Sequence, residues 1–330
     1  MALQEVTWFH PTMMDATVRE GVAPVHAFMR AASGTPLDTH AVGADGLIIE
    51  GSKHWEYTSA LQKSGLLQSA GARVLDAGCG QSAFTAYMAD LGATVHGTDV
   101  RLAAIARLCR YGVRASLGDL HALPYRDEAF DQVFCVSVLE HTQDPLRCFD
   151  ELWRVTRVGG TLSVTGDYAP CGLPARTVAA GRVMDQALLR RLVGPGAVIL
   201  DEPTSILEGL GYFPQMWPTV LPIYLRFRKE TTAPPAHHGT GATPETPPLP
   251  QPRDPGLRRH VALQCCRAAR IYLSYDWLPE ARALFAAAWR LDPHLVRARA
   301  WGLAVRLPFP LLRAARRARR ALAPAAGVGA

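Results

Sequence analysis

The sequence predicts an α/β protein with a doubly wound, mostly parallel sheet of seven strands and a small C-terminal α-helical module. Three observations predict this fold. From Arg73 to Thr165, short apolar runs alternate with helical patterns, which is typical of parallel strands covered by helices on both faces. The chain has 330 residues, more than one domain usually needs. A proline-rich stretch then separates this region from an Ala-, Leu- and Arg-rich end.

The elements follow from the periodicity of the apolar residues. Strands are expected at 73–76, 94–99, 115–119, 130–138, 160–165, 198–202 and 220–227. Helices are expected at 83–91, 102–111, 145–155 and 182–193. The main domain is therefore placed at residues 61–230, with residues 1–60 as a helical cover on its sheet.

The rest of the chain divides at a linker. Residues 231–256 contain eight prolines and few apolar side chains, so this segment cannot bury a core. Residues 257–330 are expected to form a helical module that ends in a basic tail.

Composition restricts the function. Up to Arg228 there are 19 Lys and Arg against 23 Asp and Glu, a net charge of −4, whereas from Lys229 onward there are 16 against 6, a net of +10. A domain that modified nucleic acid would normally carry its own basic groove. The acidic main domain therefore predicts a small-molecule, sugar or lipid-linked substrate and no nucleic acid.

The remaining composition predicts a soluble protein of the cytoplasm. No apolar stretch reaches the length of about 18 residues that a membrane span needs, and the first ten residues do not have the pattern of a secretory signal. Seven scattered cysteines show no zinc-ligand spacing, so they are expected to be reduced thiols, and no metal site is predicted.

The strongest motif is the run Val74-Leu75-Asp76-Ala77-Gly78-Cys79-Gly80 after the first expected strand. Glycines 78 and 80 leave out Cβ atoms that would block a ligand near the backbone. The spacing alone also fits the dinucleotide-binding turn of dehydrogenases, or a turn without a ligand. Asp76, two residues before the first glycine, favours a different cofactor.

Two further acids extend the pattern. Asp99 ends the second expected strand and Asp119 the third. Since the carboxyl ends of parallel strands share one edge, the carboxylates of Asp76, Asp99 and Asp119 should lie along one crevice. Asp99 alternatively caps the helix that follows it, and Asp119 alternatively is a solvated loop acid.

With these motifs, the segment from Arg73 to Tyr168 resembles the class I S-adenosylmethionine-dependent methyltransferases, close to the type-11 subfamily. The resemblance implies a Rossmann-like methyltransferase fold with S-adenosylmethionine as cofactor. In that family the glycine turn holds the methionine part, the acid ending strand two takes the ribose hydroxyls, and the next acid takes the adenine amine. The implied cofactor residues are Asp76, Gly78, Cys79, Gly80, Asp99, Val100, Asp119, Leu120 and Ser137.

The segment departs from the family at two places. Val158 stands where proline is common before Gly159-Gly160, and Gln81-Ser82 stands where many relatives have a third glycine. The second departure changes the shape of the turn but leaves cofactor binding expected.

Candidates for the reaction itself follow the fourth strand. His141 closes a Leu-Glu-His triplet typical of the family, and its imidazole can deprotonate a hydroxyl near neutral pH. It alternatively packs against or orients the loop. The stretches 54–57 and 167–168 are the candidates for the substrate wall, with Tyr57 and Tyr168 as the substrate contacts. Packing of the N-terminal helix and of the loop on the sheet is the alternative.

The C-terminal module gives two weaker signals. Ala262 to Leu295 resembles one tetratricopeptide repeat, which cannot bury its own face and needs a neighbour. The arginine-rich run 311–320 is expected to contact an anionic membrane surface or an acidic protein, with a solvated tail as the alternative. If the tail contacts a membrane, the protein is expected to bind peripherally at the inner membrane face.

Taken together, the sequence predicts methyl transfer to a hydroxyl, less favourably an amine, of a small molecule or a glycan. Two other classes stay open. One is a non-catalytic scaffold with the same fold, whose helical module binds a partner. The other is a nicotinamide-dependent oxidoreductase, which leaves Asp119 and the triplet 139–141 without a role.

Overall fold

The computed structural model describes residues 2–8, 51–68, 71–80, 83–169, 183–193, 219–233, 251–274, 277–295, 300 and 302. The chain divides into two compact units, Met1–Pro248 and Leu249–Ala330. Each unit is described by itself below.

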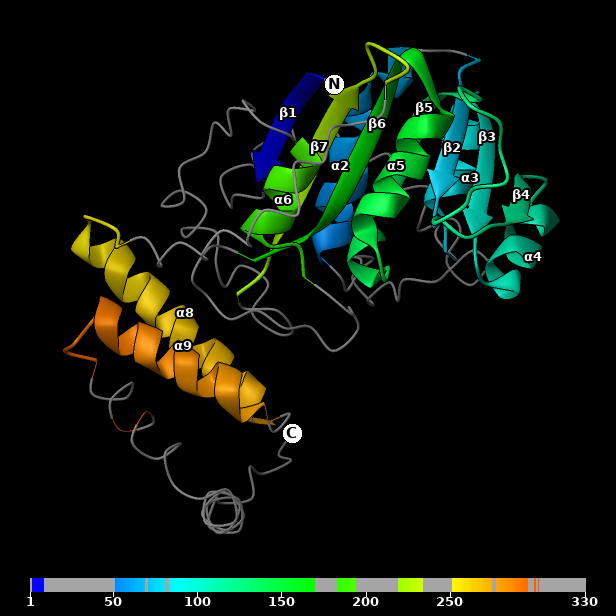
Figure 1. Ribbon diagram of the computed structural model, residues 1–330. Coiled ribbons are helices and arrows are strands. Elements are labelled where there is room, and N and C mark those ends of the chain that lie inside the picture. The colour runs from blue at the N-terminus through cyan, green and yellow to red at the C-terminus, as the bar shows by residue number, and fades with distance from the viewer. Residues whose placement is uncertain are drawn as a thin grey trace. The chain divides into compact units, whose positions relative to one another are not determined.

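The first unit is built on a sheet of seven strands in the order β1-β7-β6-β5-β2-β3-β4. The strands are β1 (Ala2–Trp8), β2 (Arg73–Ala77), β3 (Thr94–Asp99), β4 (Arg114–Leu117), β5 (Phe130–Val136), β6 (Thr156–Tyr168) and β7 (Leu221–Arg228) (Figure 1). From β6 to β4 all pairs are parallel, whereas β7 is antiparallel to both of its neighbours. The mostly parallel core predicted from the sequence is thus confirmed.

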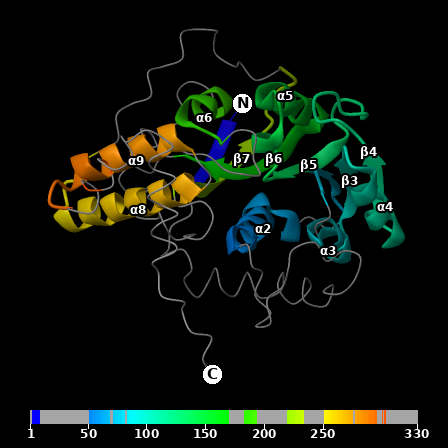
Figure 2. The ribbon, with the colours of Figure 1, turned by 90° about the horizontal axis from the view of Figure 1, so that it is seen from below.

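Helices cover both faces of this sheet. They are α2 (Gly51–Ser64), α3 (Phe84–Asp90), α4 (Leu102–Arg110), α5 (Pro145–Val155) and α6 (Gln186–Val193). Seen along the sheet, α5 and α6 lie on one face and α2 and α3 on the other (Figure 2). This is the doubly wound arrangement that alternating strands and helices predict.

The helix α5 has the bounds that its sequence predicts. Pro145 occupies the first turn, where its missing N–H costs nothing, and the side chain of Asp144 accepts the backbone N–H of Arg147 at 3.1 Å. Its apolar face is buried, and the ring of Phe149 lies edge-on to Phe227 of β7 with centroids 5.0 Å apart. Local capping and burial therefore agree on this element.

On the opposite face, aromatic rings join α2 to α3 and the sheet. Tyr57 stacks on Phe84 with centroids 4.6 Å apart, and Phe84 meets Phe134 of β5 edge-on at 5.8 Å. All three side chains are buried. This packing holds α2 on the face of the sheet formed by β5, β6 and β7.

The N-terminal segment differs from its predicted helical cover. Residues Ala2–Trp8 form an edge strand antiparallel to β7, and the helix α2 continues past residue 60 into the predicted main domain. Residues 2–8 pair with a strand more than two hundred residues away, and this partner cannot be inferred from the local sequence. The strand expected at 198–202 lies outside the described residues, so the seven strands are not the seven predicted ones.

The second unit contains two long helices, α8 (Pro255–Ser274) and α9 (Leu278–Leu291), which pack side by side (Figure 1). The helix α8 begins inside the predicted linker, because Asp254 accepts the backbone N–H of Leu257 at 2.5 Å and so caps it. Whether this pair belongs to a tetratricopeptide repeat stays a prediction. The basic run 311–320 lies outside the described residues.

Candidate cofactor site

The site lies where the strand order of the sheet reverses. From β2 the chain proceeds outward to β3 and β4, and then returns to β5 on the other side of β2. In open α/β sheets, ligands bind at the carboxyl ends of the strands at such a point. Asp76, Asp99 and Ser137 all lie at this edge.

The glycine turn after β2 has two residues in the left-handed region. Gly78 has φ +75° and Gly80 has φ +57°. The N–H groups of Gly78 and Cys79 donate to the carbonyl of Thr98 at 2.8 and 3.0 Å, which ties the turn to β3. A Cβ on Gly78 would lie 2.6 Å from both γ-carbons of Val138, so this glycine lets two turns pack together. This contact gives the first glycine a role that the motif alone does not reveal.

Gly80 faces more open space. Among the described residues, a Cβ there would come within 4 Å of only the guanidinium of Arg101, at 3.2 Å, and the carbonyl of Gly78, at 3.9 Å. The side chain of Arg101 is mostly exposed and forms an ion pair with Asp99. Gly80 is therefore the glycine beside which a ligand can approach the backbone.

Asp76 is buried beneath the turn. Its Oδ2 accepts the hydroxyl of Thr85 in α3 at 2.5 Å. Burial raises the pKa of this carboxyl to about 7, although the hydrogen bond from Thr85 lowers it. The carboxyl of Asp76 is therefore expected to titrate near neutral pH when no cofactor is bound.

Asp99 ends β3, and both of its carboxylate oxygens are held by backbone. Oδ2 accepts the N–H of Gly80 at 2.9 Å, and Oδ1 accepts the N–H of Arg101 at 2.8 Å. The second of these bonds is the helix-capping role considered from the sequence, since Arg101 precedes α4. Oδ1 also accepts the Nε–H of Arg101 at 3.2 Å, whereas Oδ2 keeps a further lone pair, so capping by Oδ1 and binding of a hydroxyl by Oδ2 are compatible.

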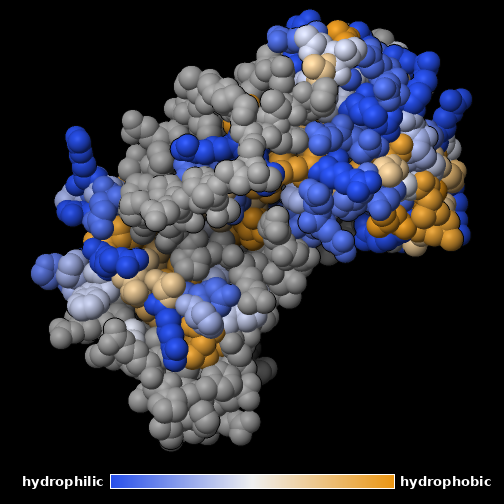
Figure 3. All heavy atoms as spheres, viewed as in Figure 1, coloured by the Kyte–Doolittle hydropathy of each residue, from blue (hydrophilic) through white to orange (hydrophobic). Residues whose placement is uncertain are grey.

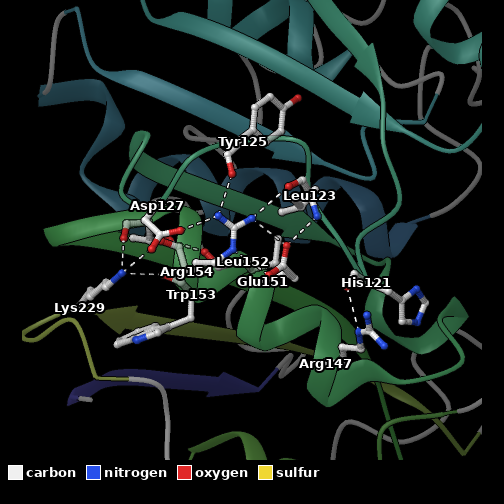
Figure 4. Close-up of polar contacts among 11 residues, drawn as sticks. His121, Leu123, Tyr125, Asp127, Arg147, Glu151, Leu152, Trp153, Arg154 and Lys229 are labelled. Carbon is white, nitrogen blue, oxygen red and sulfur yellow. Dashed lines mark hydrogen bonds and ion pairs between the residues drawn. The ribbon is translucent and has the colours of Figure 1, made fainter.

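Asp119 lies two residues beyond β4, and its carboxylate is turned toward a histidine. Oδ1 accepts both the backbone N–H and the Nδ1 of His121, at 2.9 and 2.6 Å. These bonds from His121 lower the pKa of Asp119 below its usual range. Arg147 of α5 donates to the carbonyl of His121, which fixes the same loop (Figure 4). Asp119 is thus ionised and oriented, with an exposed side chain.

The apolar residues around these acids differ in exposure. Leu120 and Cys79 are buried, and burial raises the pKa of the Cys79 thiol. Val100, directly after Asp99, is 62% exposed, and Leu102 and Leu117 beside it are exposed as well. Figure 3 shows apolar surface over this region of α4 and β4. An uncovered apolar surface next to an oriented carboxylate fits a flat ring bound beside a diol.

Ser137, the residue after β5, has an unusual conformation. Its φ of +51° is left-handed, which only glycine adopts without strain. Its N–H donates to the carbonyl and hydroxyl of Thr165, both at 3.1 Å, and its hydroxyl donates to Glu56 of α2 at 2.5 Å. The side chain of Ser137 thus stabilises the turn after β5. The residue itself lies at the carboxyl edge of the sheet, where the sequence predicts contact with the cofactor.

The candidates for the reaction lie in different surroundings. His141 ends a short 3-10 turn, Leu139–His141, and is exposed. Tyr57 and Tyr168 are both buried, Tyr57 against Phe84. The structure shows Tyr57 packed in the core. Contact of either tyrosine with a substrate stays a prediction.

Two residues of the site have no role assigned from the sequence: Arg101 stands two residues after Asp99, and Val138 fills the space beside Gly78. Glu56 belongs to the stretch 54–57 that the sequence places at the substrate wall, but the structure shows it reaching from α2 to Ser137, which follows β5. A charged residue between the aromatic residues Trp55 and Tyr57 is the local signal for Glu56. Nothing local marks Val138, because its partner is 60 residues away.

Metal ligands do not gather at this site: within the part of the chain that the structure describes, no three His, Cys, Asp or Glu side chains form a possible metal centre. Within the same residues, no helix has the length and apolar character of a membrane span.

Comparison with known proteins gives a match over the same region. Residues 75–164 match the family described as "Methyltransferase domain". Ubiquinone biosynthesis O-methyltransferase of Xanthomonas oryzae pv. oryzae is 38% identical over 108 residues, 30% of this chain and 44% of that protein. Demethylmenaquinone methyltransferase of Renibacterium salmoninarum is 34% identical over 110 residues, 33% of this chain and 46% of that protein.

A probable S-adenosylmethionine-dependent methyltransferase of Mycolicibacterium smegmatis is 28% identical over 148 residues, 43% of this chain and 58% of that protein. The chain thus spans about half the length of these relatives. The matched segment runs from β2 into β6 and contains Asp76, both turn glycines, Asp99 and Asp119. These matches support methyl transfer as the chemistry of residues 75–164, and S-adenosylmethionine as their cofactor.

Proposed function

We propose that the protein is an S-adenosylmethionine-dependent methyltransferase that transfers a methyl group to a hydroxyl of a small molecule. The single observation that carries the proposal is the geometry of Asp99. A buried carboxylate at the end of β3 is oriented by the N–H groups of Gly80 and Arg101, directly beside the glycine turn.

The residues present fit the cofactor. Oδ2 of Asp99 has a lone pair left for a ribose hydroxyl, Gly80 leaves space for the methionine part, and Val100 offers exposed apolar surface to the adenine ring. The free oxygen of Asp119 would accept the adenine amine, with Leu120 supplying the next backbone N–H.

Bound S-adenosylmethionine supplies a methyl group on a sulfonium, with a neutral thioether as the leaving group. The residues of the chain then have to bind and orient, because positioning the acceptor in line does most of the work. His141, exposed at the end of the 3-10 turn that follows β5, is our candidate to take the proton of the acceptor hydroxyl. Such proton transfer contributes on the order of 10²–10⁴-fold.

The relative named for ubiquinone biosynthesis supports an oxygen acceptor, and the two quinone-pathway names together support a small molecule. The acidic main domain agrees with this class. Two alternatives from the sequence analysis stay open: a hydroxyl of a glycan, and, less favoured, an amine.

The test is calorimetric titration of S-adenosylmethionine into the purified chain, together with Asp99→Asn. Micromolar binding that the variant weakens by about 1.5–3 kcal/mol, the contribution of a hydrogen bond to a charged group, supports the proposal. Transfer of labelled methyl to a panel of phenolic and sugar hydroxyls then identifies the acceptor. Absence of binding in the native chain refutes the proposal and favours the scaffold alternative.

The C-terminal unit has a separate proposal. The arginine-rich run 311–320 is expected to bring the enzyme to an anionic surface at the inner face of a membrane. Co-sedimentation with anionic vesicles, compared between the full chain and a chain that ends at Pro252, tests this. Equal sedimentation of both chains contradicts it.

A further inference from the structure

A buried carboxylate from outside the glycine-turn motif holds one wall of the site. Glu56 of α2 is 1% exposed, and its Oε2 accepts hydrogen bonds from the hydroxyls of Ser137 and Thr165, both at 2.5 Å. A carboxylate is costly to bury unless it is well hydrogen-bonded. Ser137 directly follows β5 and Thr165 lies in β6, so this one group ties α2 to two neighbouring strands.

The bond to Ser137 acts on a strained residue. A non-glycine residue with φ +51° persists only where its surroundings impose that conformation. Here Thr165 holds the N–H of Ser137 through its carbonyl and hydroxyl, and Glu56 holds the side chain. Thr165 in turn donates its own hydroxyl to Glu56, so the three residues restrain one another.

The conformation of Ser137 decides where the next residue goes. Both γ-carbons of Val138 come within 2.6 Å of the place where a Cβ on Gly78 would lie. Gly78 and the residue after it are bonded to Thr98 at the end of β3. A shift at Ser137 is therefore passed by direct contact to the glycine turn, and from there toward Gly80 and Asp99.

From this chain of contacts we infer that Glu56 is a positioning residue of the cofactor site. It fixes Ser137 in its left-handed conformation, and so holds Val138 against Gly78 in the geometry that binds S-adenosylmethionine. The inference rests on the proposed function, since it concerns the same cofactor.

The opposite end of the sheet offers a matched control. Asp131 near the start of β5 accepts from Arg73 of β2, whose backbone N–H lies 2.8 Å away, and from Arg157 of β6 at 2.5 Å. Like Glu56, it ties β5 to neighbouring elements with a carboxylate. Because it lies at the amino ends of the strands, Asp131→Asn should lower stability without altering the site.

The experiment measures the dissociation constant of S-adenosylmethionine by calorimetry and the thermal midpoint for wild type, Glu56→Gln, Ser137→Ala, their double variant and Asp131→Asn. Glu56→Gln should weaken binding by about tenfold, as expected when a hydrogen bond to a charged group is lost. The double variant should bind no worse than the weaker single variant, because both changes break one interaction. Asp131→Asn should bind within about twofold of wild type, as expected for a distant independent site.

Equal weakening by Glu56→Gln and Asp131→Asn would overturn the inference, as would multiplying effects in the double variant or unchanged binding by Glu56→Gln. If Glu56→Gln does not fold, Ser137→Ala and Thr165→Val replace it, since each removes one hydroxyl from Glu56 and the same non-additivity is expected. Absence of binding in wild type refutes the proposed function instead, before any variant is compared.

Discussion

At the residue scale, Asp76 connects the candidate site to stability. Its carboxyl is buried with a pKa of about 7, whereas the same group in an unfolded chain titrates near 3.8. Between these values the folded protein binds more protons than the unfolded chain. The contribution of Asp76 to the free energy of unfolding is therefore greatest in acid and falls as the pH rises from about 4 to 7.

We expect Asp76→Asn to remove this dependence. Urea titrations of the cofactor-free protein at pH 5, 6, 7 and 8 should show that the free energy of unfolding of wild type falls relative to the variant, by up to about 1.4 kcal/mol for each pH unit below 7. Above the pKa the difference should level off. Parallel pH profiles for the two proteins would contradict the burial argument.

The two glycines with φ +75° make a second prediction at this scale. A Cβ on Gly78 meets Val138, whereas a Cβ on Gly71 meets no atom of the described residues within 4 Å. Both alanine variants carry similar backbone strain, but only Gly78→Ala overpacks the site. Its binding of S-adenosylmethionine should weaken by about ten- to a hundredfold, the effect of 1–3 kcal/mol of overpacking.

Gly71→Ala, measured by the same calorimetric titration, should bind like wild type. Adding Val138→Ala to Gly78→Ala removes both γ-carbons and should restore part of the affinity. Equal binding by the two single variants would show that strain alone governs the turn.

At the element scale, the carboxyl end of α5 depends on a lysine that directly follows β7. Lys229 is buried, and its Nζ donates to the carbonyls of Trp153 at 3.0 Å, Arg154 at 3.3 Å and Thr156 at 2.7 Å (Figure 4). The first two carbonyls belong to the last turn of α5 and have no partner within the helix, and the third belongs to the residue that follows the helix. A positive charge there is also favoured by the helix dipole.

Lys229→Met keeps the length of the side chain and removes the three donors. The free energy of unfolding should fall by about 2–4 kcal/mol, because buried carbonyls lose their partners. Urea denaturation measures this. Arg110→Met in the exposed last turn of α4 is the control and should change stability by less than about 0.5 kcal/mol. A loss of similar size in both variants would exclude the capping role.

How far the sequence predicts each element depends on where its determinants lie. The bounds of α5 are predicted in full, since Asp144 and Pro145 mark its start locally. Its cap by Lys229 could not be predicted, because more than seventy residues separate the partners. The acids Asp76 and Asp99 were found from a local motif, whereas the bond from Glu56 to Ser137 spans 81 residues and needs the fold.

At the scale of the whole molecule, every described residue of the candidate site belongs to the first unit, Met1–Pro248. We therefore expect a chain of residues 1–248 to bind S-adenosylmethionine with the affinity of the full chain. Calorimetric titration of both chains, with residues 249–330 alone as the control that should not bind, checks this. A loss of affinity of more than about tenfold in the shorter chain, equal to 1.4 kcal/mol, would mean that the second unit contributes to the site.

The pairing of β1 with β7 has a consequence for how the protein avoids aggregation. Without Ala2–Trp8, residues 223–228 of β7 would present unpaired backbone N–H and C=O groups along one edge of a mostly buried strand. Such an edge is a template onto which a strand of another molecule can add. β1 thus covers this edge of β7. A shortened chain that starts at α2 is expected to self-associate through β7.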